Sequence, residues 1–355
     1  MNKKSSLLSI LTSGSIGPFI ALLVIILFFG ICDKAFGSGE FISLKNSRQI
    51  ANSAAMIAIP ALGMTMIIIA GGIDLSAGTA LTLCGTVLVT MLNKQEPAAG
   101  EPGFALAVAL AIGVCLLSGL LCGSANGLLI TSTQVVPFIV TLGTMSIFLG
   151  TAQIIAKEST VQADLTHLPE WLDKLCYTGS NGSRYSLVPF VPTSVLVTVV
   201  LAIIVDVVLR FTVFGRNLFA IGSNRSTARL CGVPIFSTVW SLYAIAGLLF
   251  AIGGVLYIGN VKNGNPKDGV GMELLVIAAV VLGGGSLSGG RGSVLGTIIG
   301  AIIIFVIRSG CTQLQISNTY THIIIGAIII IAVIVDQLRN GMPEWLFRMV
   351  RNNSA

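Results

Sequence analysis

The sequence is poor in charged residues and in the side chains that most enzymes use for chemistry. Only 10% of its 355 residues are Asp, Glu, Lys or Arg, and it has two histidines. It therefore shows no convergent His, Asp and Glu cluster of the kind that a membrane enzyme needs. The seven cysteines are scattered and have neither Cys-x-x-Cys nor Cys/His spacing, so no metal site is expected. No Gly-Lys-Ser/Thr motif completes the glycine-rich stretches, and the chain has no visible nucleotide site of its own.

Long apolar runs are abundant instead. Hydrophobic residues make up 54% of the chain, and the mean hydropathy is +0.94. Segments such as 298–307 and 323–335 are continuously apolar, whereas the strands of a membrane barrel alternate polar and apolar residues. Lipid offers backbone groups no hydrogen-bonding partner, so each run has to be helical. The sequence predicts an all-α integral membrane protein.

We expect about ten transmembrane helices with broken or re-entrant segments. They are predicted at 16–32, 50–71, 76–92, 104–130, 136–156, 189–210, 237–259, 272–284, 293–309 and 319–336. The eighth is too short to cross about 30 Å of hydrocarbon alone, which predicts a broken or extended helix. Residues 16–338 form a single transmembrane domain between cytoplasmic tails at 1–15 and 339–355.

Basic residues set the expected orientation. The loop 211–236 and its border carry four arginines and no acid, which predicts a cytoplasmic loop; they are Arg210, Arg216, Arg225 and Arg229. The C-terminal tail adds Arg339, Arg348 and Arg351, so both termini are expected on the cytoplasmic side. The loop 157–188 has mixed charge and is predicted to be external. Positive-inside loops and anionic lipid account for the net charge of +6 without a nucleic-acid partner.

A glycine-rich segment, Gly71–Gly78, separates two apolar runs. Glycine permits a sharp reversal there, and Ser76 can cap the helix that follows. Asp74 has two readings. It is a functional acid between membrane segments, or it caps a helix near the cytoplasmic surface and fixes a turn.

A second glycine-rich segment, Gly283–Gly292, repeats the pattern of the first. Both have an apolar run, paired glycines, and then Leu-Ser and glycine. Matching interrupted segments in two halves of a chain indicate pseudo-repeats beside a transport pathway. Chance similarity in a chain with 41 glycines is the alternative.

A third segment, Phe214–Val233, predicts a short basic helix in the cytoplasmic loop. Asn224 or Ser223 can cap it, and Gly232 with Pro234 ends it. Such a helix either anchors on anionic headgroups or docks into a cleft of a cytoplasmic partner. Composition does not separate the two.

Isolated polar residues have structural explanations. Asp206 lies one turn before Arg210, which predicts an ion pair within a helix. Glu273 opens an apolar segment, where the positive end of a helix favours an acid. His322 begins the last span at the outer side.

Four segments together carry a family resemblance over about residues 45–338. They are Gly72–Ser76, Pro137–Met145, Phe214–Gly232 and Val281–Gly296. In these segments the chain resembles the permease subunits of bacterial ATP-binding-cassette importers for monosaccharides, the ribose, xylose, galactose and autoinducer-2 group, which are related to branched-chain amino-acid permeases. It departs from them at Leu149, at Leu275 and in the outer insertion 157–187, which leaves the solute open.

The resemblance implies a translocation subunit in the bacterial cytoplasmic membrane and not an enzyme. Its expected partners are a second permease copy, ATPase subunits that bind ATP and Mg²⁺, an extracytoplasmic solute-binding protein and the lipid bilayer. The chain itself is expected to bind no cofactor. The resemblance implies that the segment around Ala228 couples to the ATPase, with Arg216, Asn224, Arg225, Ala228, Arg229 and Gly232. The candidate pathway residues are Asp74, Ser76, Phe138, Thr141 and Glu273.

The rival hypothesis is an ion- or proton-coupled secondary transporter. It predicts ionisable residues deep in the membrane, whereas Asp74, Asp206 and Asp336 all fall near predicted helix ends. The inward direction of transport rests on the family resemblance alone.

Overall fold

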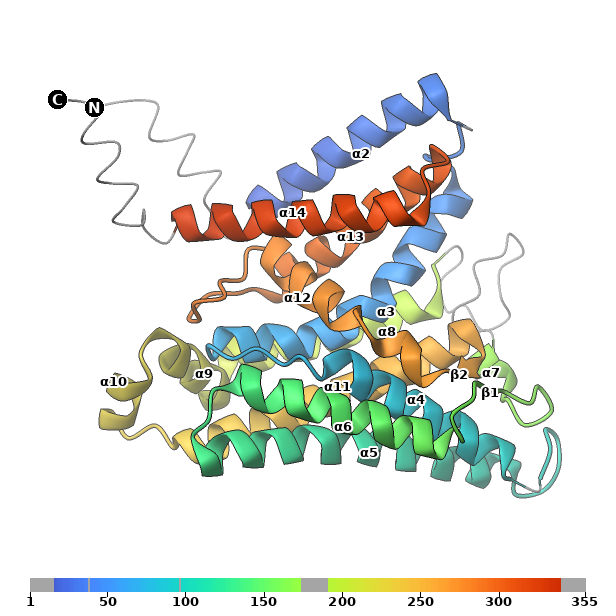
Figure 1. The fold of residues 1–355 in the computed structure, drawn as a ribbon, viewed down its shortest axis with the longest axis horizontal. Coiled ribbons are helices and arrows are strands. Elements are labelled where there is room, and N and C mark those ends of the chain that lie inside the picture. Colours follow the sequence, from blue (N-terminus) through green and yellow to red (C-terminus); the bar gives the residue numbers. More distant parts are fainter. Residues whose placement is uncertain (1–15, 38, 96, 174–190, 340–355) are drawn as a thin grey trace.

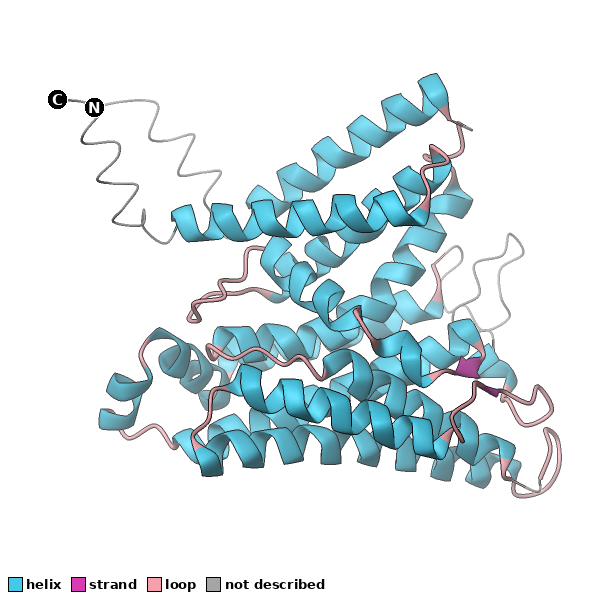
Figure 2. Cartoon of the chain, in the orientation of Figure 1, coloured by secondary structure: helices cyan, strands magenta, loops and turns pink. Residues whose placement is uncertain are grey.

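The computed structural model describes residues 16–37, 39–95, 97–173 and 191–339. The tails 1–15 and 340–355 and residues 174–190, which include the second part of the insertion 157–187, lie outside these residues, as do Arg348 and Arg351. The described chain is mostly helical, as Figures 1 and 2 show. The helices are α2 (Ile16–Phe36), α3 (Leu44–Ile69), α4 (Ala77–Asn93), α5 (Phe104–Thr133), α6 (Pro137–Ile155), α7 (Glu170–Asp173), α8 (Thr193–Phe211), α9 (Val213–Ser223), α10 (Arg225–Leu230), α11 (Ile235–Val261), α12 (Met272–Leu282), α13 (Val294–Gln313) and α14 (Asn318–Arg339).

Seven of the described helices are long and apolar enough to cross a membrane: α2, α3, α5, α6, α8, α11 and α13. Two others are short. α4 has 17 residues and α12 has 11, which at about 1.5 Å per residue span roughly 25 and 16 Å of a hydrocarbon layer near 30 Å. The prediction that the eighth segment is too short to cross alone is confirmed.

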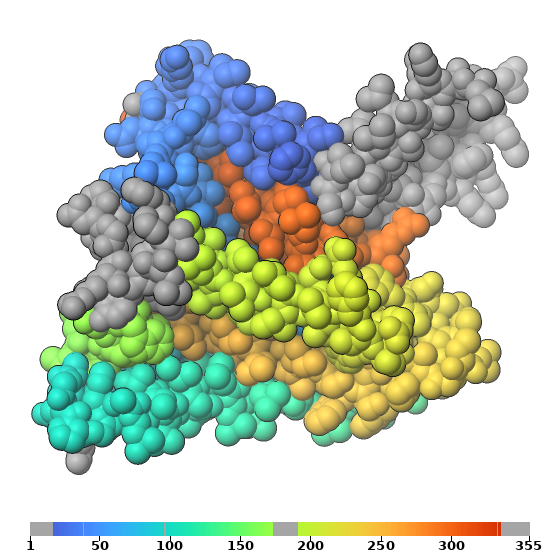
Figure 3. Space-filling view, turned by 180° about the vertical axis from the view of Figure 1, so that it is seen from behind, coloured from blue at the N-terminus to red at the C-terminus, as the bar shows by residue number. Residues whose placement is uncertain are grey.

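The bundle has a buried centre and an apolar rim. α3, α11 and α13 are mostly buried, whereas α2, α5, α6 and α8 leave most of their apolar residues at the surface. Figure 3 shows α5 and α8 on one such outer face. Contact of so large an apolar surface with lipid chains costs no free energy, whereas its contact with water would be unfavourable.

Small residues bring α5 and α11 together. Cβ atoms added at Gly119 or Gly123 would overlap backbone atoms of α11, at Gly247 and Tyr243 respectively. Close backbone approach of this kind lets membrane helices associate through dispersion contacts where no hydrophobic drive exists. The seam places Tyr243 beside the loop that follows α3, since a Cβ added at Gly72 would lie 2.8 Å from the Tyr243 hydroxyl.

The two ends of the bundle differ. α9 and α10 form one end, and α7 lies with the short strands β1 (Val161–Gln162) and β2 (Asn263–Gly264) at the other (Figure 1). The strands pair antiparallel. In the loop between β1 and α7, the backbone N–H and the hydroxyl of Thr166 donate to Asp164 at 2.9 and 2.7 Å and hold the pKa of that carboxyl below its usual range.

Candidate functional site

A buried polar network lies where the chain re-enters the bundle between α3 and α4. Asp74 and Ser76 are both fully buried. One carboxylate oxygen of Asp74 accepts from the Ser76 backbone N–H at 2.8 Å and from its hydroxyl at 2.6 Å. Asn126, from the last third of α5, donates to the Ser76 hydroxyl at 2.8 Å and to the other Asp74 oxygen at 3.4 Å. The network satisfies an acid that burial alone would make very unfavourable.

Thr141 of α6 holds the same loop through its backbone at Ile73 and Leu75. Its hydroxyl oxygen accepts from the Leu75 backbone N–H at 3.1 Å, and it lies 3.3 Å from the carbonyl oxygen of Ile73. A non-helical stretch inside a membrane protein has to have its backbone groups satisfied in this way. Side chains of α5 and α6 therefore provide the loop between α3 and α4 with the hydrogen bonds that water would otherwise make.

The structure adds detail to two expectations about this loop. Asp74 was predicted near a helix end at the cytoplasmic face; the loop follows the end of α3 and then turns back into the bundle (Figure 1), where the carboxylate is fully buried. Ser76 was expected to cap the next helix; it is the N-cap residue of α4, but its side chain makes no cap hydrogen bond. The reason is that its hydroxyl donates to Asp74 instead.

Glu273 lies beside the first turn of α4. Its carboxylate accepts from the Gly271 backbone N–H at 3.0 Å, as expected of an acid in the first turn of α12. A Cβ added at Gly78 would lie 2.8 Å from a Glu273 carboxylate oxygen. The N-terminal turns of the two short helices therefore meet inside the bundle with this acid between them.

Phe138 does not join this group. Its side chain is 46% exposed on α6, although its carbonyl oxygen lies 3.3 Å from the Thr141 hydroxyl. The structure thus brings together four of the five predicted pathway residues and leaves the aromatic ring on an outer face.

A large cavity of about 720 Å³, lined by both polar and apolar residues, lies mainly between α3, α12, α13 and α14; we call it the polar cavity because charged and hydroxyl-bearing side chains reach it. It begins among the first turns of α3 and α14 and the last turns of α13, and it reaches the first turn of α12. Its polar lining residues are Asn46, Gln49, Ser53, Tyr257, Asp268, Arg308, Ser309, Thr312, Gln313 and His322. The volume lies within the usual range for a small-molecule site.

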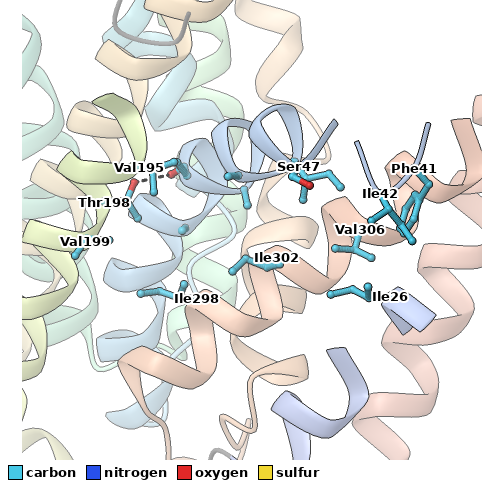
Figure 4. Close-up of a pocket in the computed structure, with 15 residues that line it drawn as sticks. Ile26, Phe41, Ile42, Ser47, Val195, Thr198, Val199, Ile298, Ile302 and Val306 are labelled. Carbon is cyan, nitrogen blue, oxygen red and sulfur yellow. Dashed lines mark hydrogen bonds between the residues drawn. The ribbon is translucent and has the colours of Figure 1, made fainter. Parts of the chain in front are cut away.

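A second cavity, of about 280 Å³, is apolar and lies between α2, α3, α8 and α13 (Figure 4). The Thr198 hydroxyl at its edge already donates to the Ser194 carbonyl oxygen at 2.8 Å. A cavity lined by Ile, Val and Ala gives a polar solute few partners, so it lies outside the candidate site.

The basic end consists of α9 and α10. Asn224 caps α10, because its side-chain oxygen accepts from the Thr227 backbone N–H at 2.9 Å, and Gly232 follows with a φ of +81°. This confirms the predicted short helix. Arg216, Arg225 and Arg229 are exposed, Leu230 is 88% exposed, and Ala228 is buried against the bundle.

Glycines join this end to the buried network. Gly222, at the end of α9, touches the carbonyl oxygen of Ile69 so closely that an added Cβ would overlap it. The Gly290 backbone N–H donates to the same carbonyl oxygen at 2.8 Å, and a Cβ at Gly289 would lie 3.0 Å from the Cα of Gly71. The two glycine-rich segments that resemble each other in sequence therefore contact each other where the basic end joins the bundle, at the end of α9.

Sequence reasoning missed Asn126, Tyr243, Asp268 and Arg308. Asn126 interrupts an apolar run, and a polar residue within a membrane helix was the available signal. The side-chain oxygen of Asn126 and the Tyr243 hydroxyl are buried without a hydrogen-bond partner among the described residues. Within those residues, His, Cys, Asp and Glu side chains form no cluster of three that could hold a metal ion.

Comparisons with known proteins point in one direction. Residues 46–333 match the family described as branched-chain amino acid transport system / permease component. The chain is 32% identical to the ribose import permease protein RbsC of Bacillus subtilis, over 92% of this chain and 94% of the relative. It is 34% identical to the galactose/methyl galactoside import permease protein MglC of Escherichia coli, over 96% and 98% of the two chains. No solved structure matches.

Proposed function

Because this chain belongs to the family of branched-chain amino acid transport system permease components, we propose that it is the membrane-spanning translocation subunit of an ATP-driven importer for a monosaccharide or a similar small polar solute. Its relatives named as ribose and galactose import permeases match it over nearly their full length. The chain resides in the bacterial cytoplasmic membrane as a multi-pass protein, and ATP is hydrolysed in a partner subunit.

The exposed basic end is the observation that carries the proposal. Arg225 and Arg229 stand on a capped helix with Leu230 beside them at 88% exposure. A helix that only supported the bundle would bury more of its surface, whereas one that seats in a cleft presents charged and apolar side chains outward. In this assignment Arg216, Asn224, Arg225, Ala228, Arg229 and Gly232 form the contact with the ATPase.

The proposed topology has ten membrane-crossing elements, counting the short α4 and α12. α2 begins and α14 ends toward the end of the molecule that carries α9 and α10 (Figure 1). Positive charge in short loops favours the cytoplasmic side, so this end faces the cytoplasm. The opposite end, with α7 and the two strands, then faces the solute-binding protein.

Alternating access follows from the connection between the basic end and the buried loop. Movement of α10 against a nucleotide-loaded partner displaces Gly222, which contacts Ile69 and Gly290 directly. The same displacement shifts the loop that holds Asp74 and Ser76, next to Thr141 and Glu273. A second copy of the chain completes the pathway, and Phe138 on the outer face of α6 lines it.

One observation favours the rival hypothesis of an ion-coupled transporter. Asp74 is buried inside the bundle, where a coupling ion or proton is usually carried. However, both of its oxygens are engaged by Ser76 and Asn126, as expected of an acid that holds a loop in place. We therefore assign Asp74 to positioning.

Copurification tests the proposal. The tagged chain is isolated in mild detergent from its native membranes as wild type and as Arg225→Glu plus Arg229→Glu. A charge-matched control, Lys157→Glu plus Lys267→Glu, alters exposed residues away from the basic end. We expect a P-loop ATPase with the wild type and the control, and its loss from the folded double variant. Retention of the ATPase by the double variant would contradict the assignment of the coupling surface.

A further inference from the structure

The polar cavity of about 720 Å³ contains two opposite charges that do not pair with each other. The Asp268 carboxylate accepts from the Tyr257 hydroxyl at 2.6 Å and from the Asn265 side-chain amide at 2.7 Å. Both donors are neutral, and among the described residues no cation lies within ion-pair distance of this acid. The acid is therefore held in a fixed orientation, but its charge is not neutralised by the protein.

Arg308, on α13, is the complementary group. Its guanidinium lies over the ring of Phe305, 5.7 Å from the centroid, and the side chain is partly buried. In the part of the chain that the structure describes, it forms no ion pair. The aromatic ring orients the guanidinium, and its hydrogen-bond donors remain available to a ligand in the cavity.

Two unpaired groups of opposite sign in one cavity select the charge of their ligand. An anion is attracted by Arg308 and repelled by Asp268. A cation is attracted by Asp268 and repelled by Arg308. A hydroxyl donates to a carboxylate and accepts from a guanidinium, so a neutral molecule with several hydroxyls satisfies both. Such charge-assisted hydrogen bonds are stronger than neutral ones.

We propose that this cavity is a binding subsite for a neutral polyhydroxylated solute, with Asp268, Arg308 and Tyr257 as its hydrogen-bonding groups. The inference rests on the proposed function. It adds the place in the fold where the solute is held on its way inward, and the charged groups that hold it. The first turn of α12 closes the inner end of the cavity beside Glu273. A solute in the subsite therefore lies next to the short helices α4 and α12.

The test measures ligand binding by saturation-transfer NMR on the permease with its copurified ATPase in lipid nanodiscs, without the solute-binding protein. The probes are ribose and galactose as neutral sugars, ribose 5-phosphate as an anion and glucosamine as a cation. The variants are Asp268→Asn and Arg308→Gln. Lys267→Gln, at an exposed neighbour of Asp268 that does not line the cavity, is the matched control.

At least one neutral sugar should bind the wild type and Lys267→Gln equally and lose about tenfold in affinity in each variant. Asp268→Asn should bind the anion better than the wild type does, and Arg308→Gln should bind the cation better. A purely structural role would not produce these opposite changes. Equal binding of the neutral sugars by wild type and both variants, or no binding by any, would overturn the subsite. The copurification experiment under the proposed function is carried out separately, so a failure of the subsite is distinguishable from a failure of the proposed function.

Discussion

Substitution of single glycines in α5 tests the helix arrangement quantitatively. Alanine is introduced at Gly113, Gly127 or Gly123, which differ in what an added methyl group would meet. Nothing lies within 4 Å at Gly113, and the nearest atom is 2.9 Å away at Gly127. At Gly123 the methyl group would overlap the carbonyl oxygen of Tyr243. The three sites share a helix and a substitution, so differences between them report on packing alone.

The expected magnitudes follow from two opposing effects. Gly→Ala within a helix gains about 1 kcal/mol from backbone entropy, and overpacking costs about 1–3 kcal/mol or more. Gly113→Ala should therefore be neutral or stabilising, and Gly127→Ala should be close to neutral or mildly destabilising. Gly123→Ala lies at the upper end of the overpacking cost, because α5 and α11 must move apart, and should lose a net of about 2 kcal/mol or more.

The assay is equilibrium unfolding of each purified variant in mixed detergent micelles by titration with a denaturing detergent. Helical circular dichroism reports the folded fraction. The reasoning would be refuted if Gly123→Ala were as stable as Gly113→Ala, since the close seam between α5 and α11 would then not exist.

Further substitutions probe the loops and the basic end. Asn126→Leu removes the donor to Ser76 and Asp74 and should cost about 1–3 kcal/mol in the same unfolding assay, whereas Ser132→Ala, on the exposed end of α5, should not. Asn224→Ala removes the cap of α10 and should cost about 1 kcal/mol locally; hydrogen exchange of Arg225–Leu230 should rise, with Ser226→Ala as control. Gly222→Ala should leave ATPase assembly intact and reduce uptake by about tenfold or more, because the methyl group overlaps Ile69; uptake equal to that of Gly143→Ala, which has open space, would disprove the connection. Asp206→Ala breaks the exposed pair with Arg210 at 2.9 Å and should change the free energy of unfolding by less than about 0.5 kcal/mol.

Local signals allowed much of the fold to be predicted from the sequence. Three predicted features depend on residues within one or two turns of each other. They are the cap of α10 by Asn224, the end of that helix before Gly232, and the ion pair of Asp206 with Arg210. The length of the eighth apolar run likewise predicted that α12 is short. The predicted third span at 76–92 agrees with α4 within a residue.

The burial of the loop before α4 inside the bundle could not be predicted in the same way. Its position depends on hydrogen bonds from Asn126 and Thr141, which lie 50 to 68 residues away in the sequence. Hydropathy averages over a window, so it detects that an apolar run ends but not that the chain turns back into the bundle. The polar cavity was missed for the same reason, since Asp268 and Arg308 come from different elements.

ATP-dependent uptake by reconstituted vesicles tests the central claim most directly. The permease is inserted with its copurified ATPase and solute-binding protein, and entry of labelled ribose and galactose is followed with ATP, without ATP, and with ionophores that collapse ion gradients. The account predicts uptake of at least one sugar that requires ATP and continues in the presence of ionophores. Uptake that runs on an ion gradient without ATP would contradict it.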